Sequence, residues 1–341
     1  MFDFSRRLRA HAPAPSLGRR ELLRAGAALP LLCLSGSPLL PRPFEATFFQ
    51  IWAGHLELSR DAWDARLVAI QQLGCRELIL QWIRLDKVSG AWEMPASLLE
   101  WLLDRAAQLG MGVRIGLPYD GRWWEALGVD DDAALAGFLM ETQLSSTQYM
   151  RDMPWASHAA FRGWYVPYEI EQYSWRTPAR CGLLLSWLGV LASASTASTP
   201  HTLAISTYFS QLKTEMRLES LWASILDKVN LRVMIQDGVG VAGMENYARI
   251  EPLCRLLRQT QRPFDMVVEL FRETSPPNSP FQAVSAPYPG VRTQLEQART
   301  AGAARSVAFA ADPWLIDVTP AAKLLLGAWR AAYGLPHTAP R

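Results

Sequence analysis

The stretch ATFFQIWAGHLELSRDAWDARLVAIQQLG, residues 46–74, contains the pattern that decides the fold. Residues 46–52 form an apolar run typical of a strand, and Ser59 follows with a side chain that can cap a helix. Apolar residues then recur at helical spacing from Trp63 onward, and Gly74 ends the segment. The stretch therefore predicts one strand followed by one helix.

The same unit recurs along the chain, which predicts a parallel sheet with helices packed outside it. Further strands are predicted at 76–82, 112–117, 163–167, 202–208, 231–236, 264–270 and 306–310, and helices at about 95–109, 130–149, 178–193, 244–259, 291–301 and 319–333. The sequence SASTASTP, residues 193–200, is interpreted as a low-complexity linker. Eight strands in this order predict an α/β fold, a (β/α)₈ TIM barrel forming a single domain over residues 44–341. An open doubly wound sheet is the alternative, but no GxGxxG follows the first strand.

The N-terminal residues 1–43 are predicted to be an export signal and linker rather than part of the fold. Arg19-Arg20-Glu21-Leu22-Leu23-Arg24 is a twin-arginine pattern, and an apolar segment follows at residues 25–34. That segment is shorter than the roughly 20 residues that span a bilayer, so no stable membrane insertion of the mature chain is expected. The predicted location is periplasmic or secreted, and an ordinary basic N-terminus of a cytoplasmic protein is the alternative.

The overall composition is that of a globular protein with no nucleic-acid partner. The chain has 341 residues, is 50% hydrophobic and carries a net charge of +2, without a lysine or arginine block beyond the N-terminus. With the predicted signal and its Cys33 removed, Cys75, Cys181 and Cys254 form an odd, widely spaced set, which predicts free thiols, with a single disulfide as the alternative. HExxH, CxxC, P-loop and GxSxG spacings are absent from the sequence, so no metal and no cofactor is predicted.

Polar and aromatic residues coincide where the predicted strands end, which is where the active site of such a barrel forms. Hydroxyl-bonding side chains beside flat rings suit a sugar, because a pyranose has polar edges and apolar faces. An oligo- or polysaccharide is therefore the predicted partner, and aromatic residues that merely cap the barrel core are the alternative. The candidate binding residues are Trp52, His55, Gln81, Trp82, Tyr119, Tyr168, Glu171, Tyr208, Gln236, Asp237 and Trp314.

Two glutamates at strand ends predict glycoside hydrolysis. Glu169 follows the fourth strand and Glu269 ends the seventh, so both should reach the barrel mouth. A retaining mechanism needs two carboxyl groups about 5 Å apart, one to protonate the leaving oxygen and one to attack the anomeric carbon. Ion pairs are the alternative roles, with Arg84 or Arg114 for Glu169 and with Arg272 for Glu269.

Three further polar residues near the predicted rim have alternative roles. Asp237 lies in an Asp-Gly pair that favours a turn, although as the partner of Glu169 it would make inversion the outcome. Glu171 lies beyond the fourth strand, where it could bond the substrate or be a loop charge. His55 follows the first strand and could act as a base or bind a sugar, whereas a structural role is the commoner one for a single histidine.

Five segments, FFQIWAGHLELS, LILQWIRLD, GWYVPYEIEQ, MIQDGVG and VVELF, resemble a bacterial family of uncharacterised barrels, the DUF4434 type, over about residues 46–314. That family is grouped with glycoside-hydrolase barrels whose acid/base follows strand four and whose nucleophile ends strand seven. The resemblance implies that Glu169 is the acid/base, Glu269 the nucleophile and Trp314 a platform at the cleaved sugar. Barrels of that clan usually place Asn directly before the acid, whereas this chain has Tyr168.

The predicted function is an exported glycoside hydrolase that acts on an exopolysaccharide or cell-envelope glycan with retention of configuration. The alternative is an inactive barrel that binds carbohydrate or assists polysaccharide assembly, which Tyr168 in place of Asn favours. A barrel lyase or aldolase is a third option, but no predicted strand end carries the lysine that a Schiff base requires.

Overall fold

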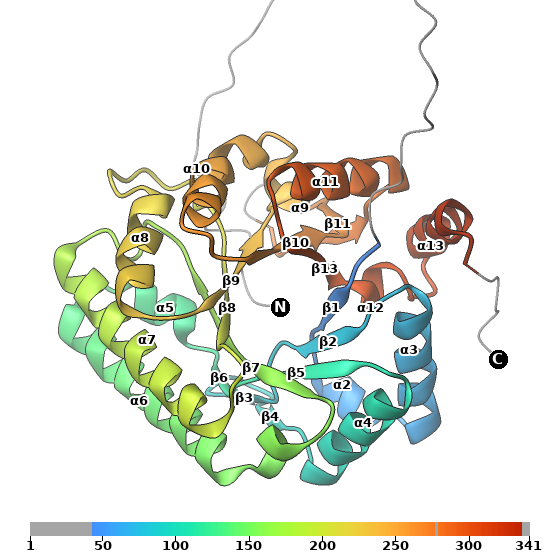
Figure 1. Cartoon of the computed structure of the whole chain (residues 1–341), viewed down its shortest axis with the longest axis horizontal. Helices are drawn as coiled ribbons and strands as arrows, with labels where there is room; N and C mark the ends of the chain where they lie inside the picture. The colour runs from blue at the N-terminus through green and yellow to red at the C-terminus, as the bar shows by residue number, and fades with distance from the viewer. Residues whose placement is uncertain (1–42, 277–278, 336–341) are drawn as a thin grey trace, which may run out of the picture.

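The computed structural model describes residues 43–276 and 279–335 as a closed barrel of eight parallel strands (Figure 1). The strands are β1 (Ala46–Phe49), β2 (Glu77–Leu80), β5 (Gly112–Gly116), β7 (Phe161–Ile170), β8 (Ala204–Thr207), β9 (Arg232–Gln236), β10 (Phe264–Glu269) and β13 (Arg305–Ala310). They follow one another in chain order around the barrel, and β13 pairs with β1 to close it. The predicted (β/α)₈ fold is confirmed, and the predicted export signal lies outside the described residues except for its last position.

Helices form a ring outside the barrel (Figure 1). The long ones are α3 (Arg60–Gln72), α4 (Ala96–Gln108), α6 (Asp132–Asp152), α7 (Pro178–Ser198), α8 (Leu218–Lys228), α10 (Asn246–Gln259), α11 (Tyr288–Thr300) and α13 (Pro320–Tyr333). The first of them begins as its sequence predicts, because the hydroxyl of Ser59 accepts a hydrogen bond from the backbone N–H of Ala62 at 3.2 Å. Gly74 then turns the chain toward β2 with a φ of 102° that few other residues adopt.

The N-terminal end of the barrel is closed by a buried cluster of ion pairs. Glu77 on β2 accepts hydrogen bonds from Arg114 at 2.9 Å and from Arg305 at 2.7 Å. Asp265 on β10 in turn accepts from Arg305 at 3.1 Å and from Arg232 at 2.8 Å. Buried charges are tolerated when they are paired and hydrogen-bonded in this way. The cluster therefore links four strands, β2, β5, β10 and β13, and reaches β9 through Arg232.

The interpretation of residues 193–200 as a linker is wrong, because α7 continues through this segment to Ser198. The hydroxyls of Ser193 and Thr196 donate to the carbonyls of Gly189 and Ala192, four residues earlier, so they are satisfied within the helix. Among the described helices, α7 is the one whose length and composition would allow it to cross a membrane. In the structure it packs against α6 as part of the outer ring.

Several elements that the sequence pattern does not predict follow the barrel strands. They are a three-stranded sheet of β3 (Arg84–Asp86), β4 (Trp92–Glu93) and β6 (Tyr119–Asp120), a hairpin of β11 (Phe271–Glu273) and β12 (Ala283–Ser285), and the short helices α2 (Ala53–Leu56), α5 (Trp123–Gly128), α9 (Val239–Ala242) and α12 (Ala311–Trp314), with a 3₁₀ turn at Pro154–Ser157. Most of them come directly after a barrel strand, so they surround the C-terminal mouth of the barrel.

The three predicted thiols Cys75, Cys181 and Cys254 are free in the structure. The first and third are buried, and Cys181 is partly exposed on α7. The disulfide considered as an alternative is therefore not formed among the described residues.

Candidate active site

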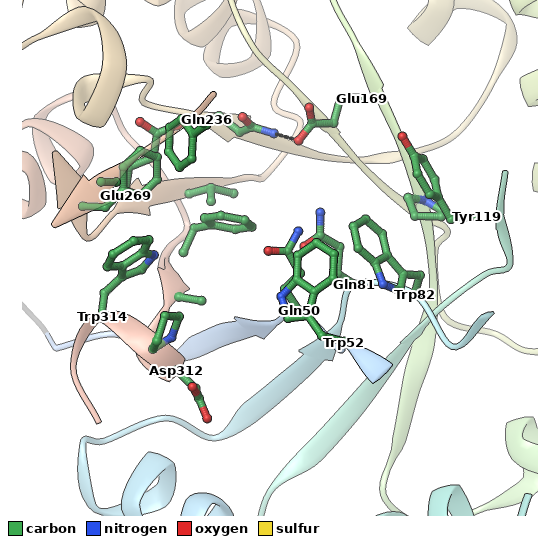
Figure 2. A pocket seen from close by; sticks show the side chains of 18 of the residues that line it. Gln50, Trp52, Gln81, Trp82, Tyr119, Glu169, Gln236, Glu269, Asp312 and Trp314 are labelled. Atoms are coloured by element: carbon green, nitrogen blue, oxygen red, sulfur yellow. Dashed lines mark hydrogen bonds between the residues drawn. The ribbon is translucent and has the colours of Figure 1, made fainter. Parts of the chain in front are cut away.

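A cavity of about 680 Å³ opens at the C-terminal mouth of the barrel. Residues at or beyond the C-terminal ends of seven of the eight strands, all except β8, contribute to its wall, as expected for the functional face of this fold. Its lining comprises Gln50, Trp52, His55, Gln81, Trp82, Tyr119, Trp123, Trp124, Pro167, Glu169, Gln236, Val267, Glu269, Phe271, Pro280, Phe281, Gln282, Ala283, Phe309, Ala310, Asp312, Pro313 and Trp314. Figure 2 shows the labelled side chains around this space, with Glu269 close to Trp314 on one side of the view and Glu169 toward Tyr119 on the other.

The alternation of side chains along β7 places Glu169 in the cavity. Tyr165 packs in the barrel interior, and Pro167 and Glu169 continue the same face into the cavity. Tyr168 lies on the opposite face, where its ring packs against Trp123 at 4.9 Å in the layer between barrel and helices. The acid therefore faces the cavity, and the tyrosine before it does not.

Glu169 is held by Gln236, which ends β9. The side-chain amide of Gln236 donates to Oε1 of Glu169 at 2.6 Å (Figure 2). Burial raises the pKa of Glu169 to about 7, and this hydrogen bond opposes the rise because it stabilises the charged form. Glu169 can therefore hold a proton near neutral pH, which a general acid requires.

Glu269 reaches the cavity from the end of β10. Its Oε2 accepts a hydrogen bond from the backbone N–H of Gly240 at 2.8 Å. A Cβ at position 240 would lie 2.9 Å from that oxygen and 2.7 Å from the ring of Phe271, so only glycine allows the approach. Burial first, and the nearby carboxyl of Asp237 second, raise the pKa of Glu269 well above its ordinary value.

Neither glutamate forms the ion pair that the sequence allowed. Arg114 pairs with Glu77 at the other end of the barrel, and Arg84 pairs with Asp86 at 2.7 Å. Within residues 43–276 and 279–335, neither Glu169 nor Glu269 has a salt bridge to a basic side chain. Two carboxyl groups are thus buried beside one cavity without a compensating cation, which is common at functional sites and costly elsewhere.

Asp237 supports the turn that carries Gly240 and does not line the cavity. Its Oδ1 accepts from the backbone N–H of Val239 at 3.1 Å, and its Oδ2 accepts from Gln294 at 2.8 Å. Burial raises its pKa to about 6, although these donors oppose the rise. The structure therefore favours the turn role over the inverting partner considered from the sequence.

Aromatic rings form two walls of the cavity. On one side Trp82 stacks on Tyr119 with ring centres 4.9 Å apart, and Trp52 meets Trp82 edge-on at 5.9 Å. On the other side Phe271 lies 5.4 Å from Trp314. Flat rings on facing walls present the kind of surface that the apolar faces of sugar rings pack against.

His55 and Asp312 lie beside the cavity without touching its two glutamates. The Nδ1 of His55 accepts from the backbone N–H of Trp52 at 2.9 Å, and burial lowers the pKa of the ring, so the histidine is neutral. Asp312 forms an ion pair with Arg66 at 3.0 Å. The described residues contain no group of three or more His, Cys, Asp or Glu side chains arranged to hold a metal ion.

The structure brings seven of the eleven predicted binding residues to the cavity, together with both predicted glutamates: Trp52, His55, Gln81, Trp82, Tyr119, Gln236 and Trp314. The other four, Tyr168, Glu171, Tyr208 and Asp237, are buried outside its lining. The carboxylate of Glu171 accepts from the backbone N–H of Ser174 at 2.9 Å and so fixes the turn after β7. These four residues therefore do not lie in the cavity, where the sequence placed them.

The lining also includes residues outside the predicted binding set: Gln50, Trp123, Trp124, Phe271, Phe281 and Asp312. Gln50 and Asp312 directly follow barrel strands, so the rule that found the other candidates applies to them as well. The remaining four belong to α5 and to the hairpin region after β10, for which the sequence shows no periodic pattern.

Comparison with known proteins agrees with this geometry. Residues 44–324 match the sequence profile of the family described as a domain of unknown function, DUF4434. The chain belongs to the DUF4434 family. A relative in Escherichia coli strain K12, the uncharacterised protein YbcH, is 25% identical over 181 residues, which are 52% of this chain and 60% of the length of YbcH.

Several solved structures of glycoside hydrolases resemble this DUF4434 member in fold. A candidate α-L-fucosidase from Bacteroides thetaiotaomicron VPI-5482 superposes with a TM-score of 0.67 at 16% identity, covering 93% of this chain and all of the other. A GH113 β-1,4-mannanase superposes with a TM-score of 0.54 at 11% identity, covering 85% of this chain and all of the other. At these identities the likeness establishes the fold, a (β/α)₈ barrel, and does not carry an activity across.

Proposed function

We propose that this DUF4434 protein is a retaining glycoside hydrolase that cleaves a polysaccharide. The observation that carries the proposal is the pair of buried carboxyl groups, Glu169 from β7 and Glu269 from β10, in one cavity walled by aromatic rings. The acid and nucleophile of a retaining glycosidase come from two such carboxyl groups. The solved glycosidase structures with the same fold support the proposal at the level of architecture.

In the proposed mechanism Glu169 protonates the glycosidic oxygen while Glu269 attacks the anomeric carbon. The bond to the leaving sugar breaks, and a covalent glycosyl ester forms on Glu269. Glu169, now a carboxylate, then takes a proton from water, whose oxygen displaces Glu269 and restores both groups. Gln236 and the N–H of Gly240 hold the two carboxyl groups in place through these steps.

The protonation of the pair must be asymmetric for this mechanism. Burial raises the pKa of both glutamates, and the charge of Glu169 adds to the rise for Glu269, so the cavity retains a proton near neutral pH. The mechanism requires that proton on Glu169 and the charge on Glu269. The N–H of Gly240 favours this arrangement, because its hydrogen bond lowers the raised pKa of Glu269. Activity should therefore fall as the pH rises through about 7, the pKa of Glu169.

Replacement of the nucleophile tests the proposal. Glu269→Gln keeps the shape of the side chain but cannot form the ester, so turnover of a cleavable glycan should fall by at least about a thousandfold while glycan binding persists. Glu125→Gln changes an exposed glutamate on α5 and serves as the matched control. Release of reducing ends from a panel of bacterial polysaccharides measures both. Undiminished cleavage by Glu269→Gln would contradict the assignment.

A second candidate function is a barrel that binds carbohydrate without cleaving it. The position before the acid holds Tyr168, whose side chain lies outside the cavity, so it cannot bond a sugar hydroxyl there. A mechanism-based 2-deoxy-2-fluoroglycoside separates the two candidates, because only a working nucleophile becomes labelled. Mass spectrometry of a peptide containing Glu269 would show the adduct.

We also propose that the protein acts outside the cytoplasm. The support is the RRELLR pattern at residues 19–24 and the short apolar segment after it. Replacing Arg19 and Arg20 by lysine should retain the protein in the cytoplasmic fraction, whereas the unchanged chain should be exported. Equal distribution of the two would refute the proposal.

A further inference from the structure

The charged groups of the cavity are all acidic. Glu169, Glu269 and Asp312 line it, and none of the lining residues in the described part of the chain is a lysine or an arginine. A carboxylate, sulfate or phosphate on a ligand would lose its hydration there and would meet only like charges. Buried charges without a partner of opposite sign are strongly disfavoured.

Two arginines beside the cavity wall are already paired with carboxylates. Arg66 donates to Asp312 at 3.0 Å and so offsets the one lining aspartate rather than a ligand. Arg122, which precedes a lining tryptophan in the chain, is held between Asp120 at 2.6 Å and Glu141 at 2.7 Å. Neither guanidinium can turn toward an anionic ligand without breaking these pairs.

Several of the neutral polar groups of the cavity are side-chain amides. Gln50, Gln81 and Gln236 come from the ends of β1, β2 and β9, and Figure 2 shows their side chains directed into the cavity. The Oε1 atom of Gln81 is buried and has no donor among the described residues. A carboxamide both donates and accepts, which matches a hydroxyl, and an acceptor that lacks a donor is satisfied by a hydroxyl and repelled by an anion.

From these observations we propose that the sugar units bound in the cavity carry no negative charge. The substrate class is a neutral glycan, as opposed to one built from uronic acids or bearing sulfate or phosphate groups. This inference rests on the proposed function, since it concerns the ligand of the same site. It goes further because it decides which polysaccharides the site accepts.

Matched pairs of polymers test the inference. Hyaluronan, alginate and polygalacturonate are each compared with the carboxyl-reduced polymer, in which every uronic acid has become the neutral sugar. Affinity electrophoresis with the full chain carrying Glu269→Gln measures binding without cleavage, and because this variant lacks one acidic group, the discrimination it shows is a lower limit. In each pair that binds, the carboxyl-reduced polymer should bind at least about tenfold more tightly than the acidic polymer. Equal or tighter binding of the acidic member would overturn the inference.

The outcomes separate this inference from the proposed function. If the reduced polymers bind but the unchanged protein cleaves none of them, the hydrolase proposal fails and the neutral ligand stands. If an acidic polymer is preferred and cleaved, the hydrolase proposal stands and the inference fails. If neither member of any pair binds, both fail.

A second test changes the protein instead of the ligand, by introducing a cation into the cavity. Gln50→Lys supplies the positive charge that the lining lacks, so the preference for the reduced polymer should shrink about tenfold. Gln50→Met has a similar length and no charge, and it should leave the preference unchanged. If Gln50→Lys and Gln50→Met showed the same ratio of affinities for the reduced and the acidic polymer, the electrostatic argument would be refuted, because the cation would have had no effect.

Discussion

Replacing Gln236 by methionine should raise the pKa of Glu169. In the native site the amide of Gln236 donates to Oε1 of Glu169 at 2.6 Å, which stabilises the carboxylate over the neutral acid. Methionine fills a similar volume but cannot donate. The charged form of Glu169 therefore loses its hydrogen bond, while the burial that raises its pKa remains.

The size of the shift follows from the strength of the bond. A hydrogen bond to a charged group contributes about 1.5–3 kcal/mol, and one pKa unit corresponds to about 1.4 kcal/mol. Removing the bond should raise the pKa by about 1 to 2 units. The starting value is about 7, so Glu169 should keep its proton well into the alkaline range.

The titration can be measured without a substrate. Carbon-13 labelling of glutamate side chains allows the carboxyl resonance of Glu169 to be followed against pH, and its disappearance in Glu169→Gln assigns it. Gln81→Met is the control, because Gln81 is also a lining glutamine but donates no hydrogen bond to Glu169. An unchanged or lowered pKa in Gln236→Met would refute the reasoning. In an active enzyme the alkaline limb of the pH profile should move by the same amount.

Other features give further predictions. Gly240→Ala should push Glu269 from its place and lower kcat about tenfold or more, whereas Gly182→Ala, at an open position on α7, should leave kcat unchanged; steady-state kinetics of both variants checks this. Although burial alone would raise it, the pKa of Glu77 is lowered from 4.5 to about 2 by its arginine partners, so this group stabilises the fold above pH 4.5. About 3 kcal/mol of unfolding free energy should be lost as the pH falls from 4.5 toward 2, and Glu77→Gln should remove that part of the pH dependence in urea titrations. Trp82→Ala should weaken glycan binding by about 1–2 kcal/mol, measured by calorimetry, because it removes the ring stacked on the cavity wall.

The strands and most helices could be predicted because their signals are local. A capping hydroxyl such as Ser59, apolar spacing and a terminal glycine define an element without reference to the rest of the chain. The same logic located Glu169 and Glu269, since strand ends meet at one face of a barrel. The linker at residues 193–200 was mistaken because serine and threonine were taken to disfavour a helix. Their hydroxyls are satisfied by carbonyls of the preceding turn.

The errors in the binding set have a different cause. The sequence predicted the fourth strand only to Pro167, but β7 extends to Ile170, with a register shift against β8 after Val166. Which side chains point inward beyond Pro167 is fixed by pairing with neighbouring strands, and a single segment does not contain that information. Tyr168 was therefore placed in the cavity although it faces the helices. The hairpin that carries Phe271 was missed for a similar reason. Its two strands are short, and such strands depend on contacts with other elements that a single segment does not reveal.

The distribution of tryptophans gives the protein an optical reporter. The fourteen indoles all fall within the described residues, and only Trp52, at the edge of the cavity, is classed as exposed, with 38% of its surface accessible. A charged quencher such as the caesium cation, which the acidic cavity does not repel, should therefore act mainly on Trp52. A glycan lying against the Trp52 and Trp82 rings would shield it, so protection from quenching would report occupancy in unlabelled protein and allow whole libraries of polysaccharides to be screened before any product is known.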